Sequence, residues 1–183
     1  MRALLLLLAL VLGGLPGGPA FGARGQEAAE VFSPDELRAA LLSKLPPYIN
    51  WPDAPAGTPL VIGVLGGPNP SARLLEQLLR DVQVRQRPVE VRYFAEGAGI
   101  EEAHLLYVPA GREAEFAALP PERLRGMVTV GEDPGFLRQG GLINLRPDTA
   151  GAKISLQISL KNARSQGVRI STPLLRIAEV VDR

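Results

Sequence analysis

Apolar runs of strand length alternate, through the middle of the chain, with segments whose apolar residues recur at helical spacing. Nearly continuous apolar runs are typical of strands buried on both faces of a sheet. Strands that alternate with helices predict an α/β fold with a largely parallel sheet, because parallel neighbours need helical crossovers. The predicted strands are 60–66, 88–94, 104–109 and 126–133, and the predicted helices between them are 71–81 and 111–119.

The C-terminal third has a different pattern. Two apolar strands, 140–147 and 153–160, are joined by a short turn-rich loop, which predicts an antiparallel hairpin. A short helix ending at Gly167 should follow, then the extended segment 168–171, and then a final helix capped by Thr172-Pro173 and running to Val181. The complete pattern predicts a Rossmann-like mixed sheet, largely parallel, with an antiparallel C-terminal hairpin and with helices on both faces.

A further helix is predicted before the first strand. Ser33 is suited to the N-cap, Pro34 to the first helical position and Glu36 to a capping box. Two consecutive prolines after Leu45 should end this helix. The large ring of Trp51 follows, and we expect it to pack against the core.

The first 23 residues have the order of a secretory signal peptide, with Arg2, an apolar run and a small-residue cleavage region that ends at Ala23. The apolar run is far shorter than the roughly 20 residues that span a bilayer, so we expect cleavage rather than anchoring. Cleavage leaves 160 residues for export. These should form a polar lead-in over 24–32 and one domain over 33–183.

Composition excludes several function classes. Loss of Arg2 with the signal leaves 19 basic and 19 acidic side chains, so no long-range attraction to nucleic acid or to anionic lipid is predicted. The chain has no cysteine and a single histidine, His104, which excludes disulfides, thiolate chemistry and the common zinc sites. No acidic pair has the spacing of a calcium loop. We therefore expect neither a metal nor another cofactor.

The glycine-rich turn after the first strand raises the question of a phosphate-binding loop. A dinucleotide fingerprint needs three glycines at fixed offsets and an acid at the end of the second strand, and a P-loop needs a lysine. None of these is present, so Gly66-Gly67 is interpreted as a sharp turn from strand to helix. Because ligands of open α/β sheets bind at the carboxyl ends of strands, Gly67 and Asn69 are still candidates for a ligand contact.

Two groups of titratable residues are candidates for catalysis. His104 opens a strand, but no serine in a nucleophile elbow accompanies it. Glu132 and Asp133 follow another strand, but they are adjacent in sequence, and an acid before a proline is typical of a turn. We therefore expect a neighbour to satisfy His104, and we do not expect an enzyme.

The extended segment 168–171 contains a candidate anion contact. Alternation places Val168 and Ile170 toward the core, and Arg169 and Ser171 on the opposite face. An arginine beside a hydroxyl at the start of a helix could hold an anionic group. The alternative is an ordinary surface arginine.

Five segments occur in a recognisable order between Leu37 and Ala178: YINWP, LVIGVLGG, HLLYV, VTVGEDPGFLRQGGLINL and KISLQISLKNARSQGVRISTPLLRIA. This order resembles the YfiR-like family of exported bacterial proteins. The resemblance implies a periplasmic α/β domain, often dimeric, that represses an inner-membrane diguanylate cyclase by binding its periplasmic sensor portion. Some relatives serve other membrane signalling proteins. The absence of cysteine means that redox control through disulfides cannot operate here.

Three functions follow as hypotheses. The first is a periplasmic regulatory binding protein that holds an inner-membrane diguanylate cyclase or sensor kinase inactive. The second is a periplasmic small-ligand binding protein with its pocket near Gly67 and Arg169, and the third is a hydrolase that depends on His104. For the first, the candidate partner or homodimer surface consists of Leu174, Leu175, Ile177, Val181 and Trp51, each of which could instead belong to the core.

Overall fold

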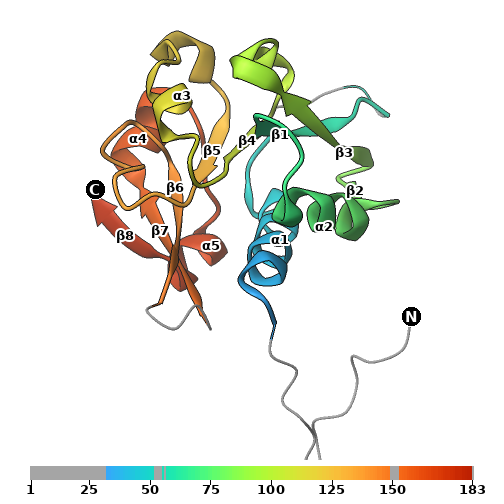
Figure 1. Ribbon diagram of the computed structural model, residues 1–183, viewed down its shortest axis with the longest axis horizontal. Helices are drawn as coiled ribbons and strands as arrows, with labels where there is room; N and C mark the ends of the chain where they lie inside the picture. The colour runs from blue at the N-terminus through green and yellow to red at the C-terminus, as the bar shows by residue number, and fades with distance from the viewer. Residues whose placement is uncertain (1–31, 52–54, 56, 149–152, 183) are drawn as a thin grey trace, which may run out of the picture. The chain divides into compact units, whose positions relative to one another are not determined.

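A computed structural model describes residues 32–51, 55, 57–148 and 153–182 (Figure 1). The described residues belong to one compact unit. The predicted signal peptide over 1–23 and the lead-in as far as residue 31 lie outside the described residues, as does the turn of the C-terminal hairpin at 149–152.

An eight-stranded mixed sheet runs through this unit. In spatial order its strands are β2 (Gln83–Val84), β3 (Arg87–Phe94), β1 (Leu60–Leu65), β4 (Leu105–Val108), β5 (Val128–Gly131), β6 (Ile143–Pro147), β7 (Ile154–Ser159) and β8 (Glu179–Asp182). β3, β1, β4, β5 and β6 pair with one another in parallel, and β2 is antiparallel to β3. β7 is antiparallel to β6, and β8 is parallel to β7. The predicted largely parallel sheet with an antiparallel C-terminal hairpin is confirmed.

The helices begin and end where local chemistry favours it. They are α1 (Pro34–Lys44), α2 (Pro70–Leu79), α3 (Glu113–Ala117), α4 (Leu160–Gln166) and α5 (Thr172–Ile177), with 3-10 turns η1 (Pro46–Tyr48), η2 (Ala95–Gly97), η3 (Ile100–Glu102) and η4 (Pro121–Leu124). The predicted capping box opens α1, because the Glu36 N–H donates to Ser33 Oγ and the Ser33 N–H donates to Glu36 Oε2. Gly167 ends α4 in the left-handed conformation, as predicted.

Apolar side chains cover both faces of the sheet, because successive strand residues point to opposite sides. Leu60, Ile62 and Val64 of β1 join one core, which also contains buried residues of α1, α2 and α5. Val61 and Leu65 join the second core with α3 and the 3-10 turns. Helices therefore cover both faces, and α1 and α2 lie side by side on one of them (Figure 1).

One local prediction is wrong, and one element was not predicted. The last helix ends at Ile177 rather than at Val181, because Ala178 is extended and the following residues pair with β7 as the edge strand β8. The short hairpin of β2 and β3 was not predicted. Its turn places Arg85 and Gln86 at φ values of 51° and 64°. Glycine and asparagine are the usual residues there, so the sequence carried no hairpin signal.

Phe136 lies in a space that two glycines leave open. Its ring is fully buried and packs against Phe116, with 4.6 Å between ring centroids. A Cβ on Gly131 would lie 2.4 Å from this ring, and a Cβ on Gly141 would lie 2.2 Å from it. The neighbouring Gly140 instead supplies a turn, with φ of 94°. Gly140 is thus needed for its backbone conformation, whereas Gly141 is needed because the Phe136 ring leaves no room for a side chain.

Candidate functional site

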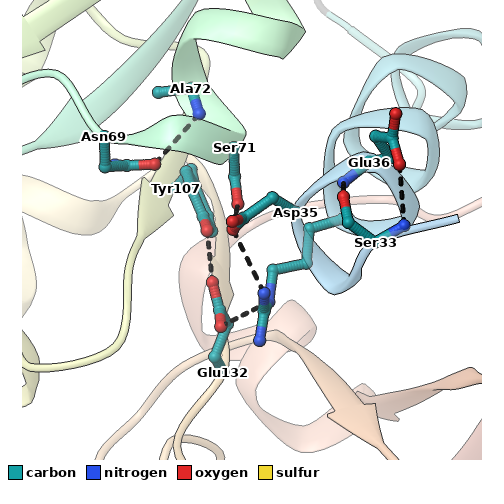
Figure 2. A network of polar contacts seen from close by, with 9 residues as sticks. Ser33, Asp35, Glu36, Asn69, Ser71, Ala72, Tyr107 and Glu132 are labelled. Carbon is teal, nitrogen blue, oxygen red and sulfur yellow. Dashed lines mark hydrogen bonds and ion pairs between the residues drawn. The ribbon is translucent and has the colours of Figure 1, made fainter. Parts of the chain in front are cut away.

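A cluster of polar side chains lies where β4, β5, α1 and α2 meet (Figure 2). Glu132 directly follows β5, and its side chain is 8% exposed. Tyr107 of β4 donates its hydroxyl to Glu132 Oε1, and Arg38 of α1 donates from Nε to Oε2 at 2.6 Å. Both carboxylate oxygens are therefore engaged.

The cluster continues to the start of α2. Asp35 Oδ1 accepts from Ser71 Oγ at 2.6 Å and from Arg38 Nη1 at 3.3 Å, and Figure 2 shows the Asp35 and Ser71 side chains pointing toward one another. Arg38 thus joins two carboxylates on different elements. This network ties α1 to the carboxyl ends of the central strands, which is the edge where open α/β sheets often bind ligands.

Burial dominates the electrostatics of the cluster. It raises the pKa of Glu132 above its ordinary value, although the Tyr107 hydroxyl and Arg38 act in the opposite direction. Burial, followed by the Glu132 charge, also raises the pKa of Tyr107. A general base needs an oxygen open to substrate, and here each Glu132 oxygen already has a donor. The arrangement is that of a structural link rather than of an open catalytic site.

Sequence reasoning missed most of this cluster. The sequence pairs Glu132 with the adjacent Asp133 as a candidate for catalysis. In the structure its partners are Arg38 and Tyr107, which lie 94 and 25 residues away in the chain. One signal was present, since a tyrosine inside a buried strand needs a partner for its hydroxyl. The identity of that partner depends on how α1 sits on the sheet, which periodicity does not specify.

The glycine-rich turn is a strand-to-helix connection, as interpreted. Gly66 adopts φ of 89°, whereas a Cβ on Gly67 would have no atom within 4 Å. Asn69 is the N-cap of α2, and its Oδ1 accepts from the Ala72 N–H at 2.9 Å. The cap role accounts for the Oδ1 of Asn69 but not for its Nδ2, which is buried without a partner among the described residues. A ligand contact by Gly67 or Asn69 stays a prediction.

The segment around Arg169 alternates as predicted. Val168 and Ile170 pack against the core, and the Arg169 side chain is exposed. Ser171 precedes α5 as its N-cap, but its hydroxyl makes no capping hydrogen bond and is buried without a partner among the described residues. No hydrogen bond joins the Arg169 and Ser171 side chains within the part of the chain that the structure describes. An anion contact at this pair also stays a prediction.

The candidate apolar surface divides into core and exterior. Leu174 and Trp51 are 1% and 8% exposed and belong to the core, so they cannot form a contact surface without rearrangement. Leu175 is half-buried against the same core. Ile177 and Val181 are 69% and 47% exposed. Only these last two retain the character of a partner or dimer surface.

His104 is engaged by neighbours, as expected for a histidine at a strand edge. Its Nδ1 lies 3.2 Å from the Val61 N–H, and its Nε2 lies 2.7 Å from Nη2 of the buried Arg87. A neutral imidazole accepts at one nitrogen only, and an imidazolium accepts at neither. Burial, then the charges of Arg87 and Arg92, lower the pKa of His104. The ring can therefore accept from only one of these two donors, although both of its nitrogens lie against protein groups.

Acidification is expected to destabilise the fold through His104. Because its pKa in the folded state lies below the ordinary 6.5, the unfolded chain binds the proton more readily, and stability falls as pH drops below 6.5. Urea unfolding at pH 7 and pH 5 should show a smaller loss for His104→Gln than for the wild type. Glu132 has a raised pKa and so acts in the opposite direction, but its contribution cancels between the two proteins. An equal loss of unfolding free energy in the wild type and in His104→Gln would contradict a role of His104 in the acid sensitivity.

Within the described ranges, no three His, Asp or Glu side chains group as a metal site would require. No helix of the described residues is long and apolar enough to cross a membrane.

Comparison with known proteins supports one family. A search of curated proteins finds no match. A solved structure of a conserved domain protein from Vibrio cholerae is similar in fold, with a TM-score of 0.54 and 14% identity. The similarity covers 82% of this chain and 60% of that one. The YfiR/HmsC-like family model matches residues 35–179, which include nearly every described element, and the chain therefore belongs to the YfiR/HmsC-like family.

Proposed function

We propose that the chain is a periplasmic regulator that binds the periplasmic portion of an inner-membrane signalling protein, a diguanylate cyclase or a sensor kinase, and holds it inactive. Membership of the YfiR/HmsC-like family is the observation that carries this proposal, because members of that family are regulators rather than enzymes. The closed polar cluster at Glu132 and the engaged His104 agree with it, since neither leaves a group free for chemistry.

The C-terminal edge, which we define as Ile177 together with β8, is the proposed contact surface. β8 is the last strand of the sheet, so its outer side has no neighbouring strand among the described residues. An open strand edge can accept an added strand from a partner. Ile177 and Val181 place exposed apolar side chains at this edge. A protein partner could form hydrogen bonds with the open backbone groups and bury the exposed apolar side chains beside them.

Aspartate at Ile177 is expected to weaken partner binding at least about tenfold, because a buried interface would have to desolvate the new charge. The measurement is biolayer interferometry between the purified protein and the purified periplasmic portions of the diguanylate cyclases and sensor kinases of the same organism, of which the one that binds the wild type is used. Leu78→Asp is the matched control, since Leu78 is an exposed apolar residue on α2. Both variants should keep the wild-type unfolding midpoint.

The same variants distinguish a partner surface from a homodimer surface. Sedimentation velocity on Ile177→Asp shows whether the oligomeric state changes. Loss of a dimer with unchanged partner affinity would reassign the C-terminal edge to contact between copies of this chain. Equal affinities for Ile177→Asp and Leu78→Asp, with no change in oligomeric state, would remove the edge as a contact surface.

A further inference from the structure

A cavity of about 570 Å³ lies on the polar side of the C-terminal strands. Leu145 of β6 and Leu156 of β7 point into the core on one side of the sheet, so the next residues, Arg146 and Gln157, point to the other side. Arg146, Gln157 and Asp182 of β8 line the cavity from the sheet. Arg138, from the turns after β5, and Lys161, from the start of α4, complete its walls.

The cavity concentrates positive charge. Arg138, Arg146 and Lys161 come from three different elements, and within the described part of the chain none of them forms an ion pair. The one carboxylate in the lining is Asp182. Three cations against one carboxylate leave a formal charge of +2, whereas the whole sequence carries only +1. This local excess is therefore not a reflection of overall composition.

Neither carboxylate oxygen of Asp182 accepts a hydrogen bond from a cationic side chain. Its Oδ2 accepts from Ser159 Oγ at 2.9 Å, and its Oδ1 accepts from the Lys161 N–H at 3.1 Å. These donors are a neutral hydroxyl and a backbone amide. The guanidinium groups of Arg138 and Arg146 and the ammonium group of Lys161 thus remain available to a ligand.

Hydrogen bonds hold the framework of the cavity in place before any ligand binds. Asn162 donates from Nδ2 to Leu137 O at 2.8 Å and to Gly141 O at 2.6 Å, which holds the turns that carry Arg138 against α4. Gln157 is buried and donates to Glu179 Oε2 at 2.9 Å. A site whose supporting groups are already bonded loses less entropy when it binds.

We propose that this cavity binds a small organic dianion, carrying either a phosphate or two carboxylates. Arginine side chains recognise both groups through paired N–H donors, and a charge of +2 matches a dianion. The volume falls in the range of small-molecule sites, roughly 300 to 1,000 Å³. The position differs from both earlier ligand candidates, Gly67 and Arg169. The cavity borders the C-terminal edge at Val181 and Asp182, but the inference does not rest on the proposed regulatory function.

Isothermal titration calorimetry of the purified protein at low ionic strength, with inorganic phosphate and with succinate, tests the proposal. At least one probe should bind with a Kd below about 1 mM, and the double variant Arg138→Gln/Arg146→Gln should weaken it at least about tenfold. Arg73→Gln/Arg80→Gln is the charge-matched control, because both arginines are exposed on or at the end of α2, outside the cavity, and it should bind as the wild type does.

The outcomes separate the ligand classes. Binding of phosphate alone identifies a phosphate ester, binding of succinate alone identifies a dicarboxylate, and binding of both identifies a general dianion site. If neither probe binds with a Kd below about 1 mM, the proposal is overturned, and so it is if Arg73→Gln/Arg80→Gln and Arg138→Gln/Arg146→Gln weaken binding equally. The partner is absent from this experiment, so its failure would leave the regulatory proposal standing. Loss of partner binding in Ile177→Asp would likewise say nothing about the anion.

Discussion

Replacing Arg38 by methionine should lower the free energy of unfolding by about 3 kcal/mol at pH 7, because removing one member of a buried ion pair leaves the other charge buried without compensation. The Arg38 side chain is 19% exposed, and that of its partner Glu132 is 8% exposed. The variant also removes the donor that Asp35 shares with Glu132. Urea unfolding followed by circular dichroism measures the loss.

The pH dependence of the stability of Arg38→Met provides a second test of the Arg38–Glu132 pair. Arg38 lowers the pKa of Glu132, so its removal should raise that pKa further above the ordinary value. A group whose folded pKa is raised stabilises the fold when protonated. The Arg38→Met variant should therefore regain part of its stability as pH falls from 7 toward 5, in contrast to the loss expected through His104.

Two further variants control this prediction. Arg92→Met removes an arginine that pairs with Glu90 and Glu102 on the surface, and it should cost less than about 1 kcal/mol. The double variant Arg38→Met/Glu132→Leu removes both charges and should recover much of the loss. Equal effects of Arg38→Met and Arg92→Met would contradict the view that Glu132 links α1 to the sheet.

Alanine at Gly141 should cost about 3 kcal/mol, because the new Cβ would lie 2.2 Å from the Phe136 ring in a filled core. The ring cannot move away freely, since Gly131 on β5 approaches it from another side and Phe116 packs against it. Thermal and urea unfolding measure the change. Gly67→Ala is the matched control, and its effect should stay within about 0.5 kcal/mol because its Cβ would meet no atom within 4 Å.

A compensating substitution tests the mechanism. Phe136→Leu alone should destabilise the protein by leaving a void. Combined with Gly141→Ala, the smaller side chain leaves room for the methyl group, so the double variant should be more stable than the sum of the single losses predicts. Strict additivity would show that Gly141→Ala acts through the backbone and not through the ring.

Local sequence patterns predicted the central strands of the sheet but not the site. Buried strands such as 60–66 are short apolar runs between turn residues, and the Ser33 capping box and Gly167 act within a few residues of their own helices. The Arg38–Glu132 pair joins residues 94 positions apart, and its formation depends on where α1 docks. Local patterns do not encode that placement.

Two other features show the same limit. The end of the chain reads as helix from Leu174 to Val181, yet pairing with β7 makes its last residues a strand, because the backbone hydrogen bonds of the sheet outweigh helical spacing. The cations around the 570 Å³ cavity lie at positions 138, 146 and 161, with no spacing that marks a site. They converge only after the hairpin and α4 have formed.

The most direct test of the central claim, that this protein acts by binding and not by chemistry, is the output of an intact diguanylate cyclase or sensor kinase whose periplasmic portion binds the purified chain. Reconstituted in vesicles with its periplasmic portion accessible, that protein should lose cyclase or kinase activity at least about tenfold when the purified chain is added at saturation. His104→Gln should repress as the wild type does. Unchanged output at saturation, or turnover of a metabolite by the purified chain that His104→Gln abolishes, would contradict the account.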